Sequence, residues 1–206
     1  MGCRGGANEG NRAARLPNQH IAVKSKLLLI GAALAAATAL PAQAGVEADA
    51  FAAFTTTCGA GDYANVVAAT EAGGWKPSQG KIAALPGVTV TSTLSRQIVI
   101  GASTVVLVVS KGTAANGRVT VTACDVFADH SSGLTGLDVP AQAFTEVPPQ
   151  TSDNSQVAFR YAGPSGQRRA VADTEINGAL GGEGVTSLTL KQAGAVSHFT
   201  LINMRM

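Results

Sequence analysis

The stretch Phe51–Trp75, FAAFTTTCGAGDYANVVAATEAGGW, decides the fold that we expect for the chain. It contains the single tryptophan of the sequence and two segments with apolar residues at helical spacing. Phe51, Phe54 and Cys58 stand at positions i, i+3 and i+7, so they share one face of a helix predicted over Glu47–Thr57. We expect this face to pack on a later sheet.

A second helix is predicted directly after the break at Gly59-Ala60-Gly61. Asp62 is suited to cap its N-terminus, and the glycine pair Gly73-Gly74 is suited to end it. Trp75 follows as a second anchor. One face of this helix is lined by Tyr63, Val66, Val67 and Thr70. These side chains are typical of core packing rather than of ligand stacking.

The later part of the chain has the alternation of β-strands. Thr104–Val109 (TVVLVV) is apolar on both faces, which predicts a central strand. Arg118–Phe127 alternates so that Thr120, Thr122 and Cys124 share one side. Another strand is expected from Val88, with its β character continued by Arg96–Ile100. Further strands are expected at Val157–Tyr161, Gln167–Ala172, Ser187–Leu190 and Val196–Met204. Connecting segments are expected at Lys76–Pro86, at Asp129–Pro149 with a short helix around Val139–Phe144, and at the glycine-rich Asn177–Gly184. The pattern predicts an α+β fold, with two N-terminal helices packed on a mostly antiparallel sheet.

Residues 24–44 have the layout of a secretory signal peptide. Lys24 and Lys26 precede the apolar Leu27–Leu40, and small residues lead to a cleavage site between Ala44 and Gly45. The alternative is a membrane anchor, but the apolar run is shorter than the roughly 20 residues that span a bilayer. We expect a periplasmic or secreted protein without a membrane span after cleavage.

Cleavage would leave residues 45–206 as a single exported α+β domain. Residues 1–23 are polar and glycine-rich and fit no part of a leader, so we expect translation to start near Val23. Residues 1–44 hold five of the 15 Lys and Arg and one of the 13 Asp and Glu, so the net charge changes from +2 to −2. This balance does not favour nucleic acid as a partner.

Two cysteines, Cys58 and Cys124, remain after the predicted cleavage. An even number of cysteines in an oxidising compartment favours a disulfide between them. The alternatives are two buried thiols or a metal-binding pair. Redox catalysis is not indicated, because the sequence has no Cys-x-x-Cys motif.

Candidate catalytic chemistry rests on two histidines, His130 and His198. His130 lies near Asp125 and Asp129 in a predicted loop, and His198 lies in the last predicted strand. Neither has the spacing of a zinc site, and the alternatives are a solvated loop histidine and one that covers a sheet face. We predict no metal and no cofactor.

Two further motifs receive a structural interpretation. The turn Gly163-Pro164-Ser165-Gly166 differs from the Gly-x-Ser-x-Gly elbow of hydrolases. Arg168 and Arg169 could bind an anion. Neighbouring residues of a strand point to opposite sides, however, so the two would not bind the same anion together. We expect both to face solvent.

The stretch Phe51–Trp75, with the leader before it and a β-rich half after it, resembles a group of short, uncharacterised exported proteins of proteobacteria. The residues that carry the resemblance are Phe54, Cys58, Tyr63, Ala68, Ala69, Gly74, Trp75 and Cys124. The resemblance implies an exported α+β domain and brings no activity, cofactor or substrate.

Three functions are compatible with these residues. The first is a non-catalytic domain that binds an unidentified protein, small molecule or envelope component. The second is a hydrolase-type enzyme that uses His130 or His198, which predicts an acid or serine within hydrogen-bond reach of that histidine in a cleft. The third is an inhibitor or immunity-type partner of a secreted enzyme. We favour the first.

Overall fold

The computed structural model describes residues 45–79, 85–129 and 131–206. The predicted leader, Ala44 and His130 lie outside these residues. The described helices are α1 (Val46–Cys58), α2 (Tyr63–Ala72), α3 (Asp138–Thr145) and α4 (Ile176–Gly181), with a 3₁₀ turn at Asp173–Glu175. The strands are β1 (Lys76–Pro77), β2 (Thr89–Ile100), β3 (Ser103–Ala114), β4 (Val119–Ala128), β5 (Thr151–Ser152), β6 (Gln156–Ala162), β7 (Arg169–Ala170), β8 (Val185–Ala193) and β9 (Val196–Arg205).

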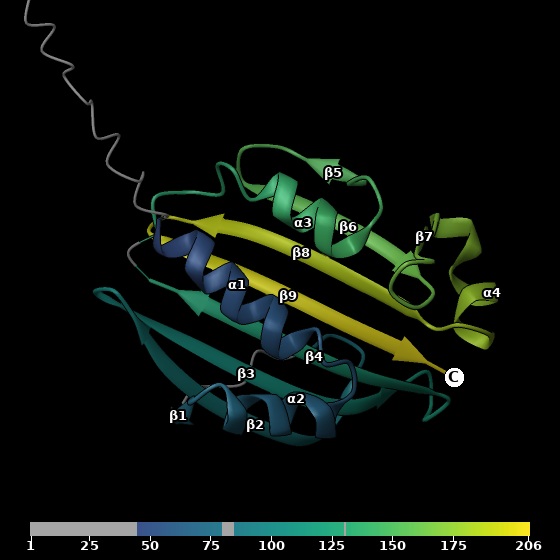
Figure 1. Cartoon of the computed structure of the whole chain (residues 1–206). Helices are drawn as coiled ribbons and strands as arrows, with labels where there is room; N and C mark the ends of the chain where they lie inside the picture. Colours follow the sequence, from purple (N-terminus) through teal and green to yellow (C-terminus); the bar gives the residue numbers. More distant parts are fainter. Residues whose placement is uncertain (1–44, 80–84, 130) are drawn as a thin grey trace, which may run out of the picture. The chain divides into compact units, whose positions relative to one another are not determined.

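The strands form one antiparallel sheet in the order β1-β2-β3-β4-β9-β8-β6-β5, with β7 paired to β6. Helices α1, α2 and α3 lie along one face of this sheet (Figure 1). The α+β prediction is therefore confirmed. We call the face under α1 the helix face and the other the opposite face.

An aromatic cluster joins α1 to the sheet. Phe51 and Phe54 pack on Phe199 of β9, with ring centroids 5.5 and 5.8 Å apart, and all three side chains are buried. The Phe51 ring meets the Phe199 ring edge to face, an arrangement that aromatic pairs favour. Truncating one such buried phenylalanine to alanine typically destabilises a protein by about 3–5 kcal/mol.

The predicted disulfide between Cys58 and Cys124 is confirmed. It joins the last residue of α1 to β4, with the two Cα atoms 5.7 Å apart. The strand alternation explains the pairing, because the side of β4 that carries Cys124 is the side that faces α1. The bond thus links α1 to the sheet at the C-terminal end of the helix, beyond the phenylalanine contacts.

Helix α2 begins and ends where the sequence predicts. The Asp62 side chain accepts a hydrogen bond from the Asn65 N–H at 3.0 Å, and Gly74 follows the helix with a φ of 73° that favours glycine. The chain then turns so that Trp75 is buried and its Nε1–H donates to Thr57 Oγ1 at 3.2 Å. Trp75 thereby connects the end of α2 to α1.

The β character expected from Val88 to Ile100 is confirmed, because Thr89–Ile100 forms one strand, with a register shift between Val90 and Ser92. Two predicted connections, at Lys76–Pro77 and at Asn177–Gly184, differ from the observed structure. Lys76–Pro77, predicted as connector, pairs with Arg96 and Gln97 at the sheet edge. Short pairings of this kind carry no periodicity from which they could be predicted.

The predicted glycine linker Asn177–Gly184 is wrong, because α4 occupies Ile176–Gly181. Its Ala179 joins a second small core with Ala162, Val171 and Val185, against which Leu180 also packs. The glycines disfavour a helix locally, so the sequence did not predict α4, which tertiary packing stabilises. This small core includes residues of β6 and β8 that point away from the helix face.

We predict that replacing both cysteines, Cys58→Ala with Cys124→Ala, lowers the free energy of unfolding by about 4 kcal/mol. The bond closes a loop of 66 residues, and its loss restores the corresponding conformational entropy to the unfolded chain. Urea unfolding with and without reductant measures the effect. The reductant should destabilise the parent protein and leave the double variant unchanged. Equal stability of parent and variant would contradict the prediction.

Candidate functional site

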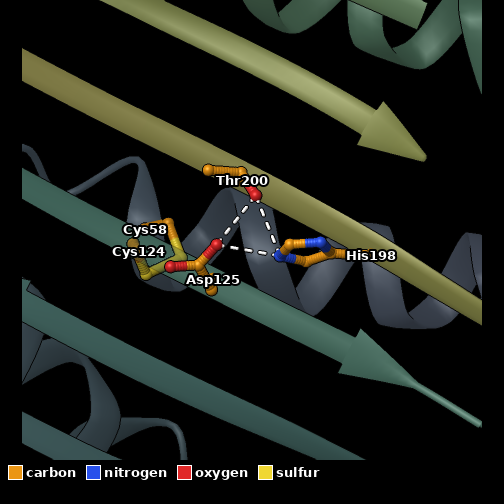
Figure 2. A network of polar contacts seen from close by, with 5 residues as sticks. All are labelled: Cys58, Cys124, Asp125, His198 and Thr200. Atoms are coloured by element: carbon orange, nitrogen blue, oxygen red, sulfur yellow. Dashed lines mark hydrogen bonds and ion pairs between the residues drawn. A yellow bond between two sulfur atoms is a disulfide. The ribbon is translucent and has the colours of Figure 1, made fainter. Parts of the chain in front are cut away.

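The candidate site lies on the opposite face of the sheet, where β4 and β9 pair. Asp125 is the register partner of Thr200, and Phe127 is the partner of His198. Because side chains alternate along a strand, Asp125 points away from α1 while its neighbour Cys124 points toward it. Figure 2 shows the disulfide behind β4 and the three polar side chains in front of it.

Asp125, His198 and Thr200 form a closed hydrogen-bond network. Asp125 Oδ1 lies 2.8 Å from His198 Nε2 and accepts a hydrogen bond from Thr200 Oγ1, also at 2.8 Å. Thr200 Oγ1 lies 2.9 Å from the same imidazole nitrogen. The Asp125 side chain is 6% exposed and the His198 side chain 28%. The network therefore holds a partly exposed imidazole over a buried carboxylate.

Phe127 fixes the orientation of the imidazole from a second direction. Its ring stacks on that of His198 with centroids 4.2 Å apart and planes 14° from parallel. Both side chains are partly buried. A ring held by stacking and by hydrogen bonds loses little further freedom on binding, which favours recognition.

The geometry does not reproduce the relay of a serine hydrolase. In that relay one imidazole nitrogen faces the carboxylate and the other faces the hydroxyl nucleophile. Here the carboxylate and the Thr200 hydroxyl both face Nε2, so Thr200 is not placed to be activated by His198. The arrangement allows a simpler role, in which Asp125 orients the His198 ring and its other nitrogen, Nδ1, acts as a base.

Sequence reasoning singled out His198 but missed both of its partners. Asp125 lies in β4, as the predicted strand Arg118–Phe127 requires, but the sequence associated it with His130, and it is 73 residues from His198. The pairing depends on the β4–β9 register, which a single sequence does not reveal. Within the described part of the chain, no three His, Cys, Asp or Glu side chains come close enough to bind a metal ion.

A second polar cluster lies at the N-terminal end of α1. The Ser132 N–H and hydroxyl groups both donate to Glu47 Oε1, and the Glu47 side chain is buried. Burial raises the pKa of Glu47, but these hydrogen bonds outweigh it and hold that pKa below its ordinary value. Next to this cluster Ser131 hydrogen-bonds Ser197, whose hydroxyl donates to Gln192 Oε1 at 2.7 Å.

The loop after β4 also lines two open hollows. One, of about 290 Å³, lies between the start of α1 and residues 132–137. The other, of about 450 Å³, lies between residues 132–138 and 152–154 and includes Gln192. Hydroxyl, amide and glycine groups dominate both hollows, and His198 lines neither.

Arg168 has a structural role, so the expectation that it faces solvent is wrong. It donates to the Phe144 carbonyl, and its guanidinium lies 5.2 Å from the Phe144 ring centroid and 4.8 Å from that of Tyr161. These cation–π contacts fasten α3 to β6. Arg169 lies 3.6 Å from the Glu183 carboxylate, and both side chains are about half exposed.

The turn that contains Ser165 is fastened to Glu146. The Gly166 N–H and the Ser165 hydroxyl donate to the Glu146 carboxylate at 2.8–2.9 Å and lower its pKa. Ser165 is thus engaged with an acid rather than with a histidine. This agrees with the interpretation of the motif as a turn.

Comparison with known proteins gives no match to a family model, to a curated protein or to a solved structure. Among the described helices, none combines the length and the apolar character that a bilayer span requires.

We predict that Glu47→Gln lowers the free energy of unfolding by about 1–2 kcal/mol at pH 7, since a charged acceptor at Ser132 is lost. A group whose pKa is lowered by folding stabilises the protein fully above its ordinary pKa of about 4.3, and this stabilisation is lost as the pH falls through the lowered pKa of the folded state. The difference between parent and variant should therefore shrink toward pH 3.

Urea unfolding at both pH values measures this difference, and Glu71→Gln on the exposed surface of α2 is the matched control. A deficit of the same size at pH 7 and pH 3 would show that the charge of Glu47 is irrelevant.

Proposed function

We propose that the chain is an exported domain that binds another protein, without catalysis, through the opposite face of its sheet around His198. The observation that carries this proposal is the His198–Phe127 pair, stacked at 4.2 Å and held from beneath by Asp125 and Thr200. Partly exposed rings in one fixed orientation are the kind of anchor on which protein interfaces concentrate their binding energy.

The neighbours of this pair extend the surface across the sheet. The register places a row of side chains on five adjacent strands, β2, β3, β4, β9 and β8, and the row consists of Gln97, Val106, Phe127, His198 and Lys191. Gln97 and Lys191 at its two ends are exposed. A broad row with polar ends around an aromatic centre has the composition of a protein interface.

The form of the surface favours a protein over a small molecule. Small ligands bind in concave sites that bury most of their surface. The hollows described above, of about 290 and 450 Å³, are lined by other residues than the row. An inhibitor of a secreted enzyme would be one kind of domain that uses such a surface.

Export rests on the leader predicted over residues 24–44 and is supported by the Cys58–Cys124 disulfide. Disulfides persist in oxidising compartments such as the periplasm and the extracellular space and are rare in the cytosol. The resemblance to short exported proteins of proteobacteria points the same way.

A photo-crosslinking amino acid placed at Lys191 in the native host tests the surface. We expect a defined protein adduct from this position and none from Glu71, an exposed residue of α2 on the helix side. Phe127→Ala should reduce the adduct at Lys191 at least tenfold, because it removes the stacked support of His198. Adducts of equal yield from both positions, or an adduct indifferent to Phe127→Ala, would refute the proposed surface.

A hydrolase-type activity is the second candidate, and the Asp125–His198 contact of 2.8 Å is the observation that favours it. An imidazole oriented by a carboxylate can activate water through its other nitrogen. This candidate predicts hydrolysis of activated esters that Asp125→Asn lowers by roughly 10²-fold. The binding proposal predicts the same background rate for the parent and for His198→Ala.

A further inference from the structure

The N-terminal end of α1 contains a buried acid directly beside the residue that follows the predicted cleavage site. Glu47 is 6% exposed, and its Oε1 atom is held by the two Ser132 donors. Its other carboxylate oxygen, Oε2, turns back toward Gly45. A Cβ atom built on Gly45 would lie 2.2 Å from Oε2, so a side chain at this position would displace the carboxylate from Ser132.

The backbone nitrogen of Gly45 is therefore close to a negative charge. It is bonded to the same Cα atom at about 1.46 Å, which places it within about 5 Å of Oε2. In the unprocessed chain this nitrogen is a neutral amide. After cleavage it would be an α-ammonium group with three hydrogen-bond donors, free to turn toward the carboxylate.

Glu47 has no competing cation in its surroundings, as far as the described residues extend. It is the charged residue of the 290 Å³ hollow, whose other lining residues are Gly, Ala, Ser, Thr and Leu. Asp49 follows Glu47 by two residues on α1, and Asp138 begins α3 directly after Leu137, which lines the same hollow. The positive end of the α1 dipole opposes a cation there, and the Glu47 carboxylate offsets that repulsion.

We propose that leader cleavage after Ala44 creates an α-ammonium group on Gly45 that pairs with the buried Glu47 carboxylate, so that processing completes the N-terminal end of α1. In the reaction an endopeptidase adds water across the Ala44–Gly45 peptide bond. The new carboxylate leaves with the leader, and the freed amine takes up a proton at neutral pH. This inference rests on the export part of the proposed function and is independent of the binding surface.

The pair has a defined dependence on pH. A partner of opposite charge raises the pKa of an amine above its ordinary value of about 7.7–8.0. The stabilisation should therefore be complete near pH 6.5, where the amine is protonated and Glu47 is ionised, and be lost as the pH rises through the raised pKa of the amine. On the acid side it is lost as Glu47 takes up a proton. Besides Glu47, the acidic residues of these two helix starts are Asp49 on α1 and Asp138 on α3.

The full chain, expressed with its own leader, provides the test. The parent is compared with a chain that carries Ser-Gly-Ser inserted between Ala44 and Gly45, which keeps the terminal charge but moves it away from Glu47. Both are prepared with Glu47 and with Glu47→Gln. We expect the parent to unfold about 2–4 °C above the insertion variant at pH 6.5, and the gap to vanish with Glu47→Gln or above pH 10.

NMR titration of the Gly45 amine supplies a readout that a purely structural role would not change, and mass spectrometry of the exported protein identifies its first residue. An amine that titrates as in a free peptide, or a gap that persists with Glu47→Gln, would overturn the pair. A first residue other than Gly45 would overturn the cleavage site. Neither result bears on the crosslinks at Lys191, so failure here is distinct from failure of the binding surface.

Discussion

The contact between α1 and the β4–β9 pair is the interaction on which the rest of the structure depends. Phe51 and Phe54 pack on Phe199, and the Cys58–Cys124 bond closes the end of the same contact. Helix α2 is connected to it through the hydrogen bond from Trp75 to Thr57. Aromatic packing and a covalent bond thus stabilise one site, where hydrophobic burial and restriction of the unfolded chain act together.

Strands β4 and β9 contribute side chains to the core on the helix face and to the candidate site on the opposite face. Cys124 and Asp125 are neighbours in sequence and point to opposite sides of β4, as Phe199 and Thr200 do on β9. The position of His198 over Asp125 therefore depends on a register that the α1 contact stabilises. A binding surface built on such strands is more rigid than one built on loops, and rigidity reduces the entropy lost on binding.

The polar loop after β4 connects this architecture to the N-terminal end of α1. Ser132 binds the carboxylate of Glu47 in the first turn of α1, and Ser131 binds Ser197 at the start of β9. Glu47 is a charged group at the N-terminal end of α1, whereas the aromatic packing and the disulfide hold the rest of this helix on the sheet. This explains why the proposed terminal amine would act on stability rather than on the binding surface.

The sequence predicts the features of this structure that follow from local patterns. The i, i+3, i+7 spacing of Phe51, Phe54 and Cys58 and the cap at Asp62 predicted both helices and their buried faces. The even number of cysteines after the predicted cleavage, with the alternation that puts Cys124 in the sheet, predicted the disulfide. The Asp125–His198 contact could not be predicted, because it depends on strand register between distant segments. Helix α4 and the position of Arg168 between two rings were missed for a related reason: tertiary packing decides them, against the local signal of glycines and of paired charges.

Amide hydrogen exchange of the oxidised protein tests most directly whether α1 belongs to the central core. If the α1 contact stabilises the β4–β9 pair, the amides of Phe54, Val126 and Leu201 should exchange with one common opening free energy, equal to that of global unfolding. Exchange of the α1 amides many times faster than those of β4 and β9 would show that the helix opens separately, and would contradict the account.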